Sequence, residues 1–153
     1  MAVQQAFSPS IGTGLAFSSL ALLYSLMLIG VYVTSSHLGL TCPDWPLCPN
    51  GFGWPADRFF FEQLHRLVAA ITAGFIISTA VYFRHAPPAR KTAAIAAVLV
   101  CVQIGFGAVV VYSKLNPFLV AAHLSTGIAL FAMALMTFLA SYRMYRGAGT
   151  KLL

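Results

Sequence analysis

Charged side chains are scarce in this sequence. Only 8% of its 153 residues are Asp, Glu, Lys or Arg, and only three of those residues are acidic. A soluble globular domain carries about 25% charged residues. Because 59% of the residues are also hydrophobic and the mean hydropathy is +0.84, the composition excludes an ordinary soluble domain and predicts a protein of the lipid bilayer.

Four long stretches are almost free of charge. Each is long enough to supply the roughly 20 apolar residues that a helix needs to cross the hydrocarbon core. The first stretch lacks a basic start and a cleavage site, so we do not interpret it as a removable signal peptide. The sequence thus predicts one all-α domain over residues 1–153, an integral membrane four-helix bundle with helices at approximately 11–35, 59–84, 92–113 and 117–142.

The basic residues are distributed unevenly between the two sides of this bundle. One side would carry Arg84, Arg90, Lys91, Arg143, Arg146 and Lys151, and the other would carry Arg58 and Lys114. The positive-inside rule then places both termini in the cytoplasm of a multi-pass plasma-membrane protein. Since the basic residues flank membrane segments instead of lining a groove, nucleic acid is not an expected partner.

Cysteine is also rare, and two of the three cysteines lie together in "CPDWPLC", residues 42–48. This loop joins the first two helices on the outer side, where conditions favour a disulfide between Cys42 and Cys48. The pair would be a structural staple or a redox-active disulfide. A zinc site that adds His37 is a third interpretation, although it lacks a fourth ligand. We expect Cys101, in the third helix, to be a small buried apolar residue.

Ionisable residues open the second helix, in "FFFEQLHR". Glu62 and Arg66 are four positions apart and can pair on one helix face. His65 shares a face with Glu62. Ionisable groups within a membrane helix usually face the bundle interior with a partner; the alternative is that these three residues anchor the helix at the water interface.

A second histidine, His123, lies at a similar depth in the fourth helix. His65 and His123 each lie about six residues into helices that run inward from the same surface, or roughly 9 Å below it. Four-helix bundles build cofactor sites from such facing side chains, so the pair predicts a heme with two axial imidazoles. The alternative is two independent polar histidines. Gln103, in the third helix, would either pack closely or hydrogen-bond a ligand.

Several motifs together resemble the heme A synthase family. They are "CPDWPLC", the ExxHR of Glu62 to Arg66, "QIGFGAVVV" followed by "LNP", and "VAAHLSTG" around His123. They occur in the family's order and span residues 30–130. The resemblance implies a membrane oxidoreductase that converts heme O to heme A by oxidising the C8 methyl group to a formyl group. Family members usually have eight helices, in two similar halves that each present a histidine pair.

The resemblance also implies roles for individual residues. His65 and His123 become the axial ligands of heme b. The family often has a basic residue before the cysteine loop, where this chain has Tyr32 or Val33; Arg66 or Arg58 would then take that cofactor-binding role. Glu62 becomes the catalytic residue near the reacting methyl group, where a carboxylate stabilises developing positive charge or accepts protons from added water. Cys42 and Cys48 become the outer-face disulfide.

A single histidine pair implies that a second copy supplies the second heme site, and a two-fold homodimer is the commonest arrangement. The resemblance further implies heme O as substrate and heme O synthase as a candidate partner. Two other function classes stay open. One is a heme b protein that transfers electrons or carries heme without substrate oxidation. The other is a quinone-linked thiol oxidase in which Cys42 and Cys48 react without heme.

Overall fold

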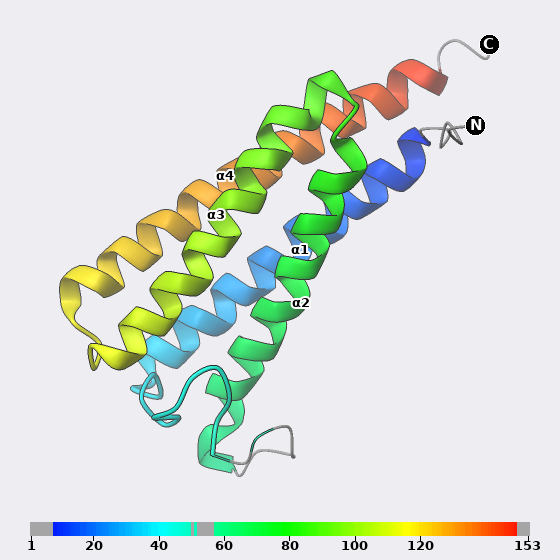
Figure 1. The fold of residues 1–153 in the computed structure, drawn as a ribbon. Helices are drawn as coiled ribbons and strands as arrows, with labels where there is room; N and C mark the ends of the chain where they lie inside the picture. Colours follow the sequence, from blue (N-terminus) through cyan, green and yellow to red (C-terminus); the bar gives the residue numbers. More distant parts are fainter. Residues whose placement is uncertain (1–7, 50, 52–56, 150–153) are drawn as a thin grey trace, which may run out of the picture.

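The computed structural model describes residues 8–49, 51 and 57–149. The remaining residues, which the sequence assigns to the same domain, lie outside this description. Four long antiparallel helices make up the fold and confirm the predicted all-α membrane architecture (Figure 1). A short 3-10 helix, η1 (Asp57–Phe59), precedes the second of them. The long helices are α1 (Pro9–Ser35), α2 (Phe60–Phe83), α3 (Pro87–Tyr112) and α4 (Pro117–Gly149).

Two helices are longer than their apolar segments. Helix α3 begins at Pro87 and not near residue 92, because proline suits the first helical turn, where its missing N–H has no intrahelical partner to lose. Helix α4 continues to Gly149, past the predicted end at residue 142. Hydropathy marks the part of a helix that lies in lipid, and the helix itself continues while its residues favour it.

The packing order of the helices places α2 and α4 diagonally across the bundle. Helix α1 packs against α2 and α4, and α3 packs against the same two helices. Figure 1 shows the α1–α2 loop and the α3–α4 turn at one end, with both termini and the α2–α3 turn at the other. The first turns of α2 and α4 therefore lie at the same end of the bundle.

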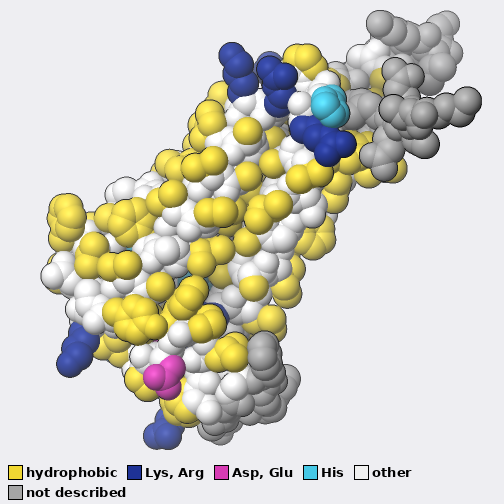
Figure 2. Space-filling model, in the orientation of Figure 1, with side chains coloured by type: hydrophobic (Ala, Val, Ile, Leu, Met, Phe, Trp, Pro, Cys, Tyr) yellow, Lys and Arg dark blue, Asp and Glu magenta, His cyan; other side chains and the backbone are white. Residues whose placement is uncertain are grey.

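All four helices are long and apolar enough to span a membrane. Figure 2 shows hydrophobic side chains along the length of the bundle and Lys and Arg side chains at its two ends. A molecule with this surface distribution buries its flanks in lipid and keeps its charges near water.

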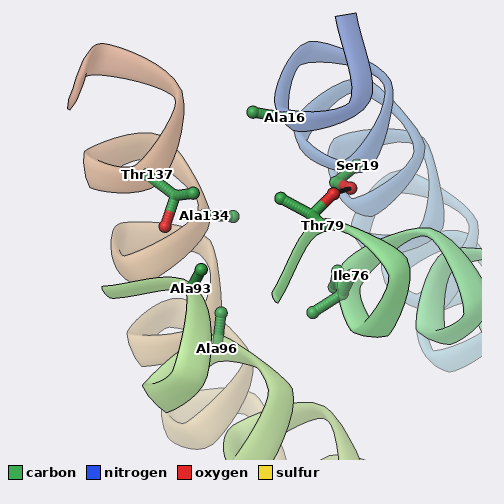
Figure 3. A pocket seen from close by; sticks show the side chains of 8 residues that line it. All are labelled: Ala16, Ser19, Ile76, Thr79, Ala93, Ala96, Ala134 and Thr137. Atoms are coloured by element: carbon green, nitrogen blue, oxygen red, sulfur yellow. Dashed lines mark hydrogen bonds between the residues drawn. The ribbon is translucent and has the colours of Figure 1, made fainter. Parts of the chain in front are cut away.

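Small residues let the helices approach closely. A Cβ atom on Gly12 would lie 2.9 Å from the ring of Phe83, so α1 and α2 are in contact at the end that carries the termini. Farther in, a cavity of about 10 Å³, roughly the volume that one water needs, lies between all four helices (Figure 3). Ser19 and Thr79 share a hydrogen bond of 2.9 Å at its edge. The cavity is lined by Ala16, Ser19, Ile76, Thr79, Ala93, Ala96, Ala134 and Thr137.

Candidate functional site

The two cysteines of the α1–α2 loop form a disulfide, as predicted. Cys42 is 0% exposed and Cys48 is 3% exposed, and both pack with Phe59. Because these sulfurs are bonded to each other, they are not available as thiolate ligands. The zinc interpretation with His37 is therefore wrong, and the described residues contain no cluster of three or more His, Cys, Asp or Glu side chains that would hold a metal ion.

The carboxylate of Glu62 binds the disulfide loop, which we define as residues 38–48. Its Oε2 accepts hydrogen bonds from the Thr41 hydroxyl and the Cys42 N–H, both at 2.8 Å. Its Oε1 accepts a bond of 2.6 Å from Arg66. Glu62 is only 4% exposed. A buried carboxylate needs such donors to offset its desolvation, and here a backbone amide and a hydroxyl of the loop provide two of them.

Arg66 also binds the disulfide loop, through backbone carbonyls of that loop. Its Nη2 donates to the Cys42 carbonyl at 3.1 Å as well as to Glu62, and its Nη1 donates to the carbonyls of Asp44 and Pro46. The Arg66 side chain is 13% exposed, so it is a paired group and not a free anchor at the water interface. Glu62 and Arg66 together dock the loop on the first turns of α2.

His65 points from α2 toward α1. A Cβ atom on Gly30 would lie 3.0 Å from the Cε1 of His65, so the absence of a side chain at Gly30 leaves room for the imidazole. The Nδ1 of His65 is buried and has no hydrogen-bond partner among the described residues. A buried polar atom without a partner is costly in a finished structure, and it is one mark of a position meant for a ligand.

His123 points from α4 toward α3. Its Cε1 lies 3.6 Å from the position that a Cβ on Gly107 would take. Its Nε2 lies 3.3 Å from the side-chain nitrogen of Gln103. Like His65, it has a buried Nδ1 that finds no partner within the described part of the chain. The side chains of Ser125 and Thr126, which follow on α4, bond to carbonyls of their own helix.

The two histidines enter the bundle from diagonal helices at the same end. Each ring is flanked by a glycine of a neighbouring helix, and each keeps one nitrogen without a partner. Imidazole is a usual axial ligand of heme iron. This pair of donors, one from each side of the interior, fits a heme with two axial imidazoles.

The sequence left two contributors unassigned. Gly30 makes room for His65, and Thr41 donates to Glu62. An isolated glycine within an apolar helix usually has a packing reason, which was a usable signal for Gly30; nothing in the sequence distinguished Thr41. The expectation for Cys101 was wrong, because its side chain is exposed on the surface of α3. Helix α3 turns other residues inward, among them Ala96 and Val100.

A family model and several known proteins match this chain. Residues 55–151 match the family described as cytochrome oxidase assembly protein. Heme A synthase from Geobacillus kaustophilus is 32% identical over 105 residues, which are 65% of this chain and 33% of that protein. Heme A synthase from Geobacillus thermodenitrificans is 32% identical over 67% of this chain and 34% of that protein. The chain thus spans about a third of the length of these relatives.

A second kind of relative carries a different name. Protoheme IX farnesyltransferase 1 from Natronomonas pharaonis is 30% identical over 123 residues, which are 79% of this chain but only 26% of that protein. The family match covers the residues from the end of the α1–α2 loop through α4, including both histidines. On this match, the chain belongs to the heme A synthase family.

Proposed function

We propose that this chain is a heme A synthase-type oxidoreductase, with heme b held by His65 and His123 and heme O as its substrate. The observation that carries the proposal is the pair of imidazoles that enter from diagonal helices at the same end of the bundle, each beside a glycine of a neighbouring helix. A bound heme b supplies one-electron redox chemistry at its iron. Gly30 leaves room for the His65 ring, and Gly107 lies beside the His123 ring.

We assign Glu62 to the reaction because it is the acidic group nearest in sequence to His65 and it faces the interior. Its two oxygens offer about four acceptor positions, of which three are taken by Thr41, Cys42 and Arg66. The fixed carboxylate would stabilise positive charge that develops at the reacting methyl group. The remaining acceptor position would take a proton from the added water.

Arg66 is the proposed propionate-binding residue. Guanidinium groups bind carboxylates in a planar, often bidentate way. Arg66 lies one residue after His65, and its Nη groups already donate to Glu62 and to loop carbonyls, so a propionate would take the place of one or two of those carbonyls. A propionate at this position would connect the heme to the disulfide loop.

We propose that two copies of the chain, or a larger homo-oligomer, form the working unit. The relatives are about twice as long as this chain, because the matched 105 and 109 residues are 33% and 34% of their lengths, and the described residues contain one histidine pair at the end of the bundle that carries the disulfide loop. A closed two-fold dimer would provide two such pairs. Chemical cross-linking in native membranes, read by mass spectrometry, should give a dimer band; a monomer alone would contradict this part.

We further propose that the chain associates with a protoheme IX farnesyltransferase, which would deliver heme O. The support is the Natronomonas pharaonis protein, in which a segment similar to this chain occupies a quarter of a larger farnesyltransferase.

We also propose that both termini lie in the cytoplasm. The support is the excess of basic residues at the end of the bundle that carries the termini.

The deciding experiment is conversion of heme O in membranes that contain the chain. A Soret band in the purified protein, followed by hydroxymethyl or formyl hemes among the extracted pigments, is the expected result. Glu62→Ala should keep the Soret band and stop the conversion, whereas Thr41→Val, which weakens the same loop contact but keeps the carboxylate, should still convert heme O. A Soret band with unmodified heme O would favour the second candidate, a heme b protein for electron transfer or heme carriage. No Soret band at all would refute both heme-based proposals.

The role of the disulfide is separable in the same assay. The Cys42→Ser, Cys48→Ser double variant should lose stability or heme binding if the disulfide is a staple. Lost conversion with normal heme content would instead mean that the disulfide takes part in electron transfer. We propose the staple, because both sulfurs are buried and the loop is docked by Glu62 and Arg66.

A further inference from the structure

The side-chain amide of Gln103 contacts His123 twice. Its nitrogen donates to the His123 backbone carbonyl at 3.0 Å and lies 3.3 Å from the His123 Nε2. The amide also packs on Gly127 of α4, where a Cβ atom would lie only 3.1 Å from the same nitrogen. Gln103 is therefore seated on the helix that carries His123, through contacts that a larger residue at Gly127 would displace.

The backbone carbonyl fixes which way this amide points. An amide oxygen in place of the nitrogen would face the His123 carbonyl oxygen, acceptor against acceptor, so the nitrogen must be the atom that faces His123. An amide nitrogen carries two hydrogens and no acceptor. One hydrogen serves the carbonyl, and the other is directed to Nε2. The Nε2 of His123 must then accept, which places the imidazole proton of the neutral ring on Nδ1.

We infer that Gln103 is a positioning residue for His123, which selects the tautomer whose lone pair is on Nε2 and holds that nitrogen until iron takes its place. The inference rests on the proposed function, in which His123 is an axial ligand. A ligand nitrogen must present its lone pair to the metal, and the hydrogen bond that fixes a ring's tautomer and orientation often comes from a neighbouring group. When iron binds Nε2, the contact with the Gln103 hydrogen is exchanged for the metal bond, while the bond to the His123 carbonyl keeps the amide beside the ring.

The test compares Gln103→Met with the wild type. Methionine keeps similar length and packing on Gly127 but has no N–H donor. The control is Ser125→Ala, because Ser125 is an exposed residue of α4 whose hydroxyl bonds only to the Ala121 carbonyl among the contacts described. In the heme-free protein, the ¹⁵N chemical shifts of His123 should report Nδ1–H in the wild type. The tautomer ratio should move toward Nε2–H by about fivefold in Gln103→Met, as expected for one lost hydrogen bond.

The heme-loaded protein supplies a second readout. Because iron replaces the Gln103 contact at Nε2, the low-spin ferric EPR signal should be the same in the wild type, Ser125→Ala and Gln103→Met. Unchanged ¹⁵N shifts in heme-free Gln103→Met would overturn the inference and leave the proposed heme site intact. A wild type that binds no heme would instead refute the proposed function and the ligand role together. In that case the ¹⁵N shifts alone decide whether Gln103 sets the tautomer.

Discussion

The contact between Glu62 and the disulfide loop predicts how fast the Cys42–Cys48 bond can be reduced. Both sulfurs are buried, so a reductant reaches them only when the loop opens, and the reduction rate follows the open population when opening is fast. Two hydrogen bonds from the loop to the Glu62 carboxylate oppose that opening. Weakening them should therefore accelerate reduction.

Glu62→Gln weakens both of these bonds without changing the size of the side chain. If the amide oxygen stays near Thr41 and Cys42, the amide nitrogen faces Arg66, so the Glu62–Arg66 bond within α2 is lost as well. Hydrogen bonds to a charged group are worth about 1.5–3 kcal/mol and neutral ones about 1 kcal/mol. The two bonds to the loop fall to neutral values, so loop opening should become easier by about 2 kcal/mol, or about thirtyfold in rate.

The assay is reduction by dithiothreitol in detergent, with released thiols alkylated and counted by mass. A Cys101→Ser background removes the exposed free thiol. Thr41→Val, which deletes one hydroxyl donor, should accelerate reduction about fivefold. Thr34→Val is the matched control, because its exposed hydroxyl bonds to its own helix, and its rate should not change. A Glu62→Gln rate within threefold of the wild type would refute the idea that this carboxylate holds the loop closed.

Two further substitutions test the bundle interior. Gly30→Ala would place a Cβ atom 3.0 Å from the His65 ring, so heme affinity measured by Soret titration should fall at least tenfold. Gly14→Ala is the control, because a Cβ there meets nothing within 4 Å, and the heme affinity should not change. Equal affinities would show that His65 tolerates displacement. Ala96→Leu would overfill the cavity of about 10 Å³ and should destabilise the folded protein by about 1–3 kcal/mol, as measured by thermal unfolding. Ala94→Leu, on the exposed side of α3, is the control and should change the stability little. A stable Ala96→Leu variant would mean that the interior can expand.

The main features of the fold were accessible from the sequence because the bilayer simplifies the problem. A chain with so few charges and four long apolar stretches has to form helices there, since lipid offers no partners to an open backbone. The cysteine pair was also predictable, because two cysteines near each other in one loop can bond without guidance from the rest of the fold. The helix ends at Pro87 and Gly149 were not predictable from hydropathy, which measures lipid exposure and not helix length.

The sequence showed which residues could make up the candidate site, but it did not show which groups contact one another there. Counting residues from the start of each helix predicted that His65 and His123 lie at the same depth, because the rise per residue of an α-helix is constant. The partners of each group depend on which helices are neighbours, a property of the whole bundle. For that reason Gly30 and Thr41 were missed, Cys101 was wrongly placed inside, and the role of Gln103 stayed open.

The sequence by itself determined that this protein is an α-helical membrane bundle with a disulfide loop and two histidines at one depth, because hydropathy, chain proximity and helical rise are local quantities. Only the tertiary structure decided that Glu62 and Arg66 clamp that loop and that Gln103 faces the Nε2 of His123. Those contacts join segments that the sequence separates by about twenty positions. Their geometry follows from the packing of α2 against α1 and of α3 against α4, which no local pattern encodes.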